Sequence, residues 1–262
     1  MKNPIKTALK SKKVTIGSWL TLAHTAVAEI MAKSGFEWLA IDMEHSVIGI
    51  QDVEPLVQVI EASGCVPLVR LWSNDPVLAK RVMDAGAYGV IVPMVNSGKD
   101  AEKAVSSVKY PPDGERGVGL YRAQGFGVKF EEYKNSINQE SLVIVQIEHK
   151  QAVENIAEIT SVTGIDGVMI GPYDISGSLG VTGELDHPSV KQAQEKVLAA
   201  AKRANIAAGI HVVHPSLEQV KNRVNEGFRF IAYSTDAILL NSQCREATSE
   251  LIKAFHGKKP RD

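Results

Sequence analysis

The chain has 262 residues, 44% hydrophobic and 23% charged, so it can bury a substantial core and fold without metals or disulfides as staples. Its 29 Lys and Arg residues against 30 Asp and Glu residues give a formal net charge of -1, which offers no general attraction to nucleic acid or to an anionic membrane. The two cysteines, Cys65 and Cys244, match neither a secreted disulfide scaffold nor a structural zinc site.

The start of the chain is polar and basic as far as Lys13 and lacks the apolar segment of a signal peptide. No window approaches the roughly 20 apolar residues that a membrane span requires. We therefore expect a cytoplasmic protein that binds neither nucleic acid nor membranes.

Short apolar, β-branched runs alternate with longer amphipathic runs along the whole chain, and no Ser-, Pro- or Gly-rich linker separates them. The apolar runs predict strands and the amphipathic runs predict helices. Pro76 and Gly35 are typical of a helix start and a helix end, respectively. In chain order the predicted elements are a strand at 14–20, a helix at 25–33, a strand at 38–44, a helix at 52–62, a strand at 66–71, a helix at 76–85, a strand at 89–95, helices at 100–108 and 130–135, a strand at 142–148, a helix at 152–161, a strand at 167–171, a helix at 189–204, a strand at 206–212, a helix at 217–225, a strand at 228–233 and a helix at 237–255.

Residues 111–127 interrupt this alternation with five glycines and two prolines. Long ordered loops often carry function. The segment is therefore either a surface connection or a mobile flap over a site.

Eight strand–helix pairs with almost entirely apolar strands predict parallel strands that helices cover. Eight such units close into a barrel, so we expect a single-domain (β/α)8 TIM barrel over residues 1–262. An open doubly wound sheet is the alternative. It is disfavoured because no glycine fingerprint follows the first strand, where the sequence is Leu20-Thr21-Leu22-Ala23-His24.

The active site of such a barrel lies at the carboxyl ends of its strands. Strands one, four, seven and eight offer little there, although His211 could line the mouth from strand seven. Four strands end in polar residues, in the sequences Ile41-Asp42-Met43-Glu44-His45, Val69-Arg70, Gln146-Ile147-Glu148-His149 and Gly171-Pro172-Tyr173-Asp174.

Glu148 and Asp174 follow strands five and six, which should be neighbours roughly 4.8 Å apart, so the two carboxylates can converge on one ion. Gln146 should point the same way as Glu148, because side chains alternate along a strand. Two carboxylates without a nearby cysteine favour Mg²⁺ or Mn²⁺ over a closed zinc site. A structural ion pair between Glu148 and Arg70 or another base at a strand end is the alternative.

His45 shares its turn with Asp42 and Glu44, so it is either a general base tuned by a carboxylate or a surface histidine. Arg70 would be costly to bury without an anion, which favours an oxyanion stabiliser over a salt bridge at the rim. The turn after strand six has free backbone N–H groups that attract a carboxylate. No lysine lies inside the predicted strands, so a carbonyl substrate would be activated by a metal rather than by a Schiff base.

Several short segments are weak signals alone and highly specific together: Gly17-Ser18-Trp19, Ile41-Asp42-Met43-Glu44-His45, Pro67-Leu68-Val69-Arg70, Asp84-Ala85-Gly86-Ala87, Ile91-Val92-Pro93-Met94-Val95, Gln146-Ile147-Glu148 and Gly171-Pro172-Tyr173-Asp174. Through them the chain resembles the HpcH/HpaI class II pyruvate aldolases over essentially its whole length. The resemblance implies reversible cleavage of a 4-hydroxy-2-oxo acid to pyruvate and an aldehyde. Such an acid is a 2-keto-3-deoxy sugar acid or 4-hydroxy-2-oxo-heptanedioate.

The resemblance also implies a divalent metal ion held by Glu148 and Asp174, which is Mg²⁺ or Mn²⁺ with Co²⁺ or Zn²⁺ as alternatives. It makes His45 the base and Arg70 the group that stabilises the enolate, and it places Gln146 in contact with substrate. These roles agree with those read from the strand ends, where Asp42 is a further catalytic candidate.

Three further implications concern Tyr173, Asp84 and the assembly. The backbone of Tyr173 and Asp174 would hold the pyruvate carboxylate, although Tyr173 stands where many relatives carry a small residue. Asp84 would raise the basicity of His45, but it falls at a helix end on the far side of its own barrel. It would therefore act from a neighbouring subunit, or the helix boundaries differ. A homo-oligomer, a hexamer or trimer that exchanges a C-terminal helix, would suit the apolar segment Ala237-Ile238-Leu239-Leu240.

Two other functions stay open. A carbon–carbon lyase of the related citrate and malyl-CoA lyase type would need a surface for CoA, and no basic nucleotide-binding stretch stands out. A non-catalytic barrel that binds oxo acids would not need a base such as His45.

Overall fold

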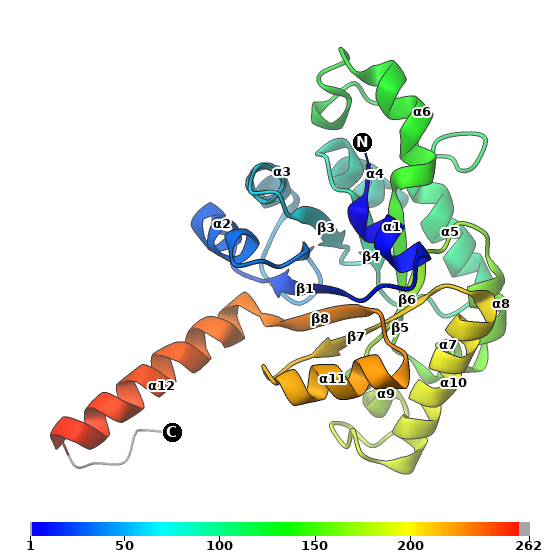
Figure 1. Ribbon diagram of the computed structural model, residues 1–262. Coiled ribbons are helices and arrows are strands. Elements are labelled where there is room, and N and C mark those ends of the chain that lie inside the picture. The colour runs from blue at the N-terminus through cyan, green and yellow to red at the C-terminus, as the bar shows by residue number, and fades with distance from the viewer. Residues whose placement is uncertain (1, 257–262) are drawn as a thin grey trace.

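A closed barrel of eight parallel strands forms the centre of the protein, in a computed structural model that describes residues 2–256. The strands pair in chain order and β8 pairs with β1, so the predicted (β/α)8 barrel is confirmed (Figure 1). One domain over residues 1–262 stays a prediction. The strands are β1 (Thr15–Leu20), β2 (Trp38–Asp42), β3 (Val66–Arg70), β4 (Gly89–Val92), β5 (Leu142–Ile147), β6 (Gly167–Ile170), β7 (Ala207–Val212) and β8 (Phe230–Thr235).

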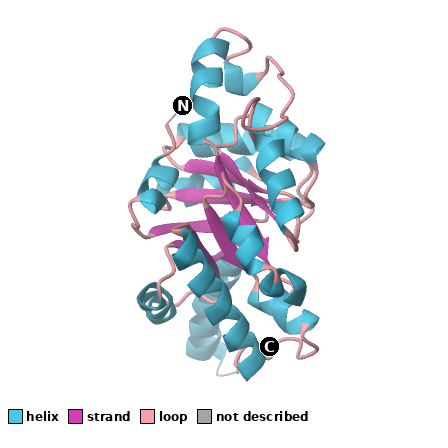
Figure 2. Ribbon diagram, turned by 90° about the vertical axis from the view of Figure 1, so that its right-hand side faces the viewer, coloured by secondary structure: helices cyan, strands magenta, loops and turns pink. Residues whose placement is uncertain are grey.

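Helices surround these strands, which lie inside the helical layer in Figure 2. None of the helices within residues 2–256 is long and apolar enough to cross a membrane. They are α1 (Pro4–Lys10), α2 (Thr25–Lys33), α3 (Ile50–Ala62), α4 (Pro76–Asp84), α5 (Gly98–Val108), the short 3-10 helix η1 (Arg122–Gln124), α6 (Phe130–Glu140), α7 (Lys150–Glu154), α8 (Ile156–Ser161), α9 (Pro172–Ser178), α10 (Pro188–Ala204), α11 (Leu217–Glu226) and α12 (Asp236–His256).

Strand side chains alternate between the barrel interior and the helix layer, as the two-residue period requires. In β2, Trp38 packs with the interior cluster while Leu39 packs with the helices. The Trp38 ring stacks on Phe230 with 4.1 Å between ring centroids. A Cβ at Gly17 would lie 2.0 Å from the Trp38 ring, so the interior tryptophan requires glycine on the neighbouring strand.

Helix α1 closes the amino end of the barrel, in a segment where the sequence predicted no element. Asn3 caps the helix, since its side chain accepts hydrogen bonds from the backbone N–H groups of Ile5 and Lys6. Ile5 and Leu9 pack against the interior cluster. The sequence did not predict this helix because Ile5 and Leu9 are the only large apolar residues on its buried side. Two apolar residues in a basic segment are too few to show a helical period.

Residues 111–127 lie at the amino end of the barrel, because they lead from α5 towards α6 and β5. Arg116 Nη2 donates to Asp84 Oδ1 at 2.5 Å, at the end of α4. Arg122 Nη2 donates to Glu61 Oε2 at 2.5 Å, near the end of α3. Of the two expectations for this segment, the structure favours the surface connection over a flap at the carboxyl ends of the strands.

Several other boundaries differ from prediction, including the ends of β2, β4 and α6, and two further differences involve specific contacts. The predicted helix at 152–161 is divided into α7 and α8 at Asn155, whose side-chain amide donates to the Asn96 carbonyl at 2.8 Å. Strand β8 begins and ends two residues later than predicted. Its register with β1 shifts after Gly17, and Ser234 takes a φ of +56° at this bulge.

The buried Asp236 carboxylate joins the end of β1 to the start of α12. It accepts hydrogen bonds from the backbone N–H of Thr21 at 2.9 Å and of Leu22 at 2.8 Å, and from the Thr21 hydroxyl at 2.6 Å. The backbone N–H of Ala237 donates to it as well, at 2.8 Å. One side chain therefore satisfies the donors where the barrel closes.

We expect Asp236→Ala to lower the free energy of unfolding by about 3 kcal/mol, because it leaves the N–H groups of Thr21 and Leu22 without partners. Urea denaturation measures this change. The matched control is Asp186→Ala, which removes an exposed ion pair with Lys191 and should leave the free energy of unfolding almost unchanged. Equal losses in the two variants would contradict the closing role of Asp236.

Candidate active site

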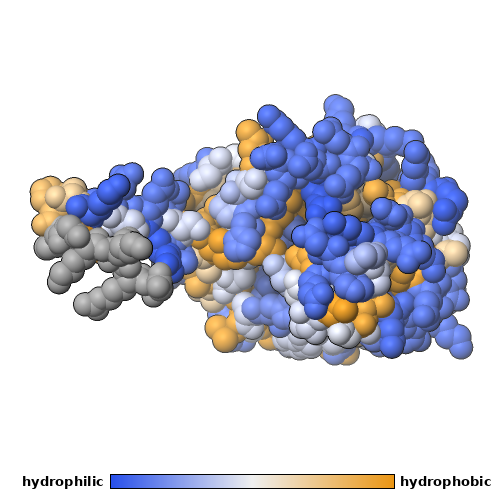
Figure 3. All heavy atoms as spheres, turned by 90° about the horizontal axis from the view of Figure 1, so that it is seen from below, coloured by the Kyte–Doolittle hydropathy of each residue, from blue (hydrophilic) through white to orange (hydrophobic). Residues whose placement is uncertain are grey.

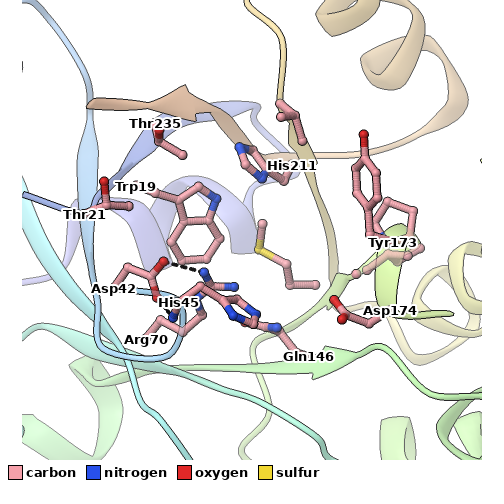
Figure 4. Close-up of a pocket in the computed structure, with 15 residues that line it drawn as sticks. Trp19, Thr21, Asp42, His45, Arg70, Gln146, Tyr173, Asp174, His211 and Thr235 are labelled. Carbon is pink, nitrogen blue, oxygen red and sulfur yellow. Dashed lines mark hydrogen bonds and ion pairs between the residues drawn. The ribbon is translucent and has the colours of Figure 1, made fainter. Parts of the chain in front are cut away.

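A cavity of about 360 Å³ opens at the carboxyl ends of the strands (Figure 4). Its walls come from β1, β2, β3, β5, β6, β7 and β8 and from residues that follow β1, β2, β6 and β7. Six of the predicted site residues line it, namely Asp42, His45, Arg70, Gln146, Tyr173 and Asp174. Glu148 is buried, and it lies beside the wall at Gly171.

Arg70 and Asp42 form a bidentate ion pair at the ends of β3 and β2. Arg70 Nε donates to Asp42 Oδ1 at 2.9 Å and Arg70 Nη2 donates to Oδ2 at 2.6 Å (Figure 4). The guanidinium also lies 4.1 Å from the centroid of the Trp19 ring. The anion that a buried arginine requires is therefore Asp42, and the expected alternative pair between Glu148 and Arg70 is not formed.

Glu44 brings a further carboxylate to the same place. Its Oε2 lies 3.3 Å from Arg70 Nη1 and accepts no hydrogen bond from residues 2–256. Burial raises the pKa of Glu44 to about 7, and the carboxylate of Glu148 adds to this effect while the Arg70 charge opposes it. A proton or an added cation near Glu44 is therefore stabilised.

The side chain of His45 is 59% exposed and lies at the mouth of the cavity. Its Nε2 is 3.8 Å from Glu44 Oε2. Asp42 contacts His45 only through the backbone, since Asp42 Oδ1 accepts the N–H groups of Glu44 and His45. Asp42 thus shapes the turn that carries the imidazole, and the nearest carboxylate to the ring belongs to Glu44.

Both oxygens of Glu148 accept hydrogen bonds at the end of β5. The backbone N–H of Met94 donates to Oε1 at 2.6 Å, from a residue with a φ of +51°. Gln146 Nε2 donates to Oε2 at 2.5 Å, which leaves Gln146 Oε1 buried without a partner among residues 2–256. Burial raises the pKa of Glu148, although both donors favour its ionised form.

Glu148 and Asp174 face one point beside Gly171. A Cβ built on Gly171 would lie 3.2 Å from Glu148 Oε2 and 3.4 Å from Asp174 Oδ2. A small cation near this point could be shared by both carboxylates and leave positions for water or substrate. The two are a pair and not a closed cluster, because residues 2–256 contain no group of three His, Cys, Asp or Glu side chains that could hold a metal.

Tyr173 and Asp174 occupy the first turn of α9, directly after β6. The first backbone N–H of this helix with a helical partner is that of Ile175, which donates to the Gly171 carbonyl at 3.0 Å. The N–H groups of Tyr173 and Asp174 precede it and are free of backbone partners, as expected at a helix start.

Asp84 lies away from the cavity, at the end of α4. It pairs with Arg116 Nη2 at 2.5 Å, and Gln124 Nε2 donates to the same oxygen at 3.3 Å. The structure therefore does not bring Asp84 to His45 within one chain, and the predicted helix end at this position explains why.

Strands one, seven and eight contribute more to the cavity than the sequence suggested. Trp19 and Thr21 line it from β1, His211 from β7 and Thr235 from β8. The signal for His211 was present, since Ala207 faces the interior and the two-residue period carries this face through Gly209 to His211. Met94 contributes a backbone group, which no side-chain pattern reveals.

Burial lowers the pKa of His211 to about 4, and the nearby Arg70 charge adds to the effect. The unfolded chain, with an ordinary histidine pKa near 6.5, binds more protons than the folded chain between these values. Stability attributable to His211 is therefore complete above about pH 6.5 and is lost as the pH falls towards 4.

We expect acidification from pH 7.5 to pH 5 to destabilise the wild-type protein by about 2 kcal/mol relative to His211→Asn. The Asn variant has no titrating group here, so the difference isolates the histidine. Urea denaturation at both pH values measures it. A difference that is independent of pH would contradict the lowered pKa.

Known proteins resemble this chain in sequence and in structure over most of its length. The HpcH/HpaI aldolase/citrate lyase family matches residues 15–242. A 4-hydroxy-2-oxo-heptane-1,7-dioate aldolase from Salmonella dublin is 40% identical over 242 residues, which cover 92% of this chain and 91% of that protein.

Two solved structures share the whole fold. The crystal structure of a HpcH/HpaI aldolase/citrate lyase family protein from Burkholderia cenocepacia J2315 has a TM-score of 0.91 and 34% identity, covering 95% of this chain and 99% of that one. The HpcH/HpaI aldolase from Desulfitobacterium hafniense DCB-2 has a TM-score of 0.88 and 31% identity, covering 97% and 98%. The chain therefore belongs to the HpcH/HpaI aldolase/citrate lyase family, as its sequence motifs indicate.

Proposed function

We propose that the protein is a carbon–carbon lyase that reversibly cleaves a 4-hydroxy-2-oxo acid to pyruvate and an aldehyde. The observation that carries this proposal is the pair of carboxylates, Glu148 and Asp174, that face one point beside Gly171. Gly171 lines the same cavity as Arg70. Such an arrangement can hold a cation against an α-oxo acid and place a positive charge where an enolate develops. The aldolase name of a relative that is 40% identical supports the same reaction class.

A divalent cation held by Glu148 and Asp174 fits the residues present. The site holds more carboxylates than its one guanidinium can balance, and Gln146 Oε1 is a buried acceptor without a partner among residues 2–256. Oxygen donors of this kind favour Mg²⁺ or Mn²⁺, with Co²⁺ or Zn²⁺ as alternatives. When bound, the ion would supply Lewis acidity towards the 2-oxo group of the substrate.

The protein's own groups then divide the remaining tasks. His45, exposed at the cavity mouth, accepts the proton of the C4 hydroxyl as the C3–C4 bond breaks and returns it to the C4 oxygen in condensation. The enolate left by cleavage takes up a proton from solvent at C3 to give pyruvate. Arg70, fixed by Asp42, stabilises the negative charge of the pyruvate enolate. The Gln146 amide contacts the substrate.

The free N–H groups of Tyr173 and Asp174 hold the pyruvate carboxylate in this proposal, as the start of a helix favours an anion. They lie on the same turn as the Asp174 carboxylate. The carboxylate and the 2-oxo group of pyruvate would therefore be bound by adjacent parts of one segment.

We also propose a homo-oligomer, a trimer or hexamer, in which Asp84 of one subunit approaches His45 of another. Asp84 cannot do so within its own chain, where it pairs with Arg116. Helix α12 extends away from the barrel (Figure 1), and Figure 3 shows apolar residues at the outer end of this helix. Its Leu240, Leu251 and Phe255 are exposed. A second subunit would cover these apolar side chains. A cytoplasmic location stays a prediction.

Proton exchange at C3 of pyruvate in D₂O, followed by NMR, tests the proposed reaction without knowledge of the aldehyde. We expect exchange with added Mg²⁺ and none after dialysis against EDTA, with the loss of metal checked by elemental analysis. Added Mg²⁺ should restore the exchange. Persistence of exchange in the metal-free protein would contradict the metal role, and absence of exchange with metal would contradict the aldolase.

Gly171→Ala should weaken Mn²⁺ binding by about 10-fold or more, because the new Cβ occupies the point that both carboxylates face and lies 2.8 Å from Glu148 Cβ. The backbone at Gly171, with φ -100° and ψ 85°, does not itself require glycine. Isothermal titration calorimetry measures the affinity. Gly177→Ala is the control, since its Cβ would meet no atom nearer than 3.8 Å, and an equal loss there would contradict the proposed ion position.

A further inference from the structure

His211 is an inward-facing residue whose role the proposed reaction does not explain. It lies one interior layer above Gly209 on β7, and it lines the cavity between Trp19 and Tyr173 (Figure 4). Its ring meets the edge of the Trp19 ring with 5.9 Å between centroids. Its position next to the cavity places it within reach of a bound substrate.

The bulge in β8 fixes the hydrogen-bonding state of His211. Ser234, with its φ of +56°, directs its carbonyl oxygen inward, where Ser18 Oγ donates to it at 3.2 Å and His211 Nε2 lies 3.1 Å away. A carbonyl oxygen only accepts, so Nε2 must carry the hydrogen. In the neutral ring Nδ1 is then a hydrogen-bond acceptor.

The Nδ1 atom is free and open to the cavity. It has no hydrogen-bond partner among residues 2–256, and it is absent from the buried polar atoms that lack one, so solvent reaches it. The lowered pKa keeps the ring neutral at physiological pH. An acceptor in this position matches a donor on the ligand, such as a hydroxyl group.

The charges around the cavity argue against a second carboxylate on the ligand. Of the described residues that line it, Arg70 alone carries a permanent positive charge, and Asp42 already binds it in bidentate fashion. The wall beside His211 includes Thr21 and Thr235, whose hydroxyl groups already bond to Asp236 and to the backbone N–H of Ile238. A neutral, hydroxylated group suits this wall, whereas a distal carboxylate would find no unpaired cation among the described residues of the same chain that line it.

We propose that His211 determines the aldehyde specificity, with Nδ1 accepting a hydrogen bond from a hydroxyl group on the aldehyde-derived part of the substrate. The proposal rests on the aldolase function proposed above. It assigns as substrates those 4-hydroxy-2-oxo acids that carry a further hydroxyl beyond C4, in place of acids that end in a second carboxylate.

The test compares glyceraldehyde, propanal and succinic semialdehyde as acceptors in condensation with pyruvate and Mg²⁺. In the wild-type protein we expect kcat/KM to be highest for glyceraldehyde. His211→Leu, which removes the acceptor at similar volume, should lower the glyceraldehyde-to-propanal ratio about 10-fold. His214→Leu is the matched control, because this exposed histidine lies outside the cavity, and it should keep the wild-type ratio.

An unchanged ratio in His211→Leu, in a protein whose wild type exchanges pyruvate protons, would overturn the role of His211 and leave the aldolase intact. A wild-type preference for succinic semialdehyde would do the same. Absence of exchange in the wild type would instead overturn the aldolase function and this inference with it. NMR of the His211 ring nitrogens gives a readout that needs no variant, and a hydrogen on Nδ1 of the neutral ring would also overturn the proposal.

Discussion

The excess of carboxylates over cations at one end of the barrel is the constraint on which the site depends. Asp42, Glu44, Glu148 and Asp174 lie at this end with the single guanidinium of Arg70, which Asp42 binds with both oxygens. Glu44 and Glu148 are left with raised pKa values, and Glu148 also accepts two hydrogen bonds. A site in this state gains stability from any ligand that brings positive charge, which is why a divalent cation and an oxo acid together suit it better than an anion alone.

Much of this site could be predicted from the sequence, because it depends on two local rules. Strand order along the chain places Glu148 and Asp174 on neighbouring strands, and the two-residue period places Gln146 on the same face as Glu148. The sequence alone did not show whether Arg70 pairs with Asp42 or with Glu148. All of these residues lie at strand ends, and only the register of β2 with β3, which sets Asp42 opposite Arg70, decides between them.

Other features depend on contacts that no local pattern encodes. Helix α1 is stabilised by Ile5 and Leu9 against an interior that the rest of the chain builds. The bulge at Ser234 follows from how β8 must meet β1 to close the barrel, and it sets the ring of His211. The sequence correctly predicted that Asp84 lies at the end of a helix. Its partner Arg116 lies on residues 111–127, for which the sequence left two interpretations open.

Helix α1 has a consequence for the order of events in the proposed reaction. Ile5 and Leu9 close the amino end of the barrel, so the cavity opens only at the carboxyl ends of the strands. Buried residues such as Gln146 and Met169 form its floor, and the exposed Tyr173 and His45 lie at its entrance. A ligand seated on the floor cannot leave until whatever sits above it has gone. Cleavage should therefore release the aldehyde before pyruvate, and synthesis should admit pyruvate first.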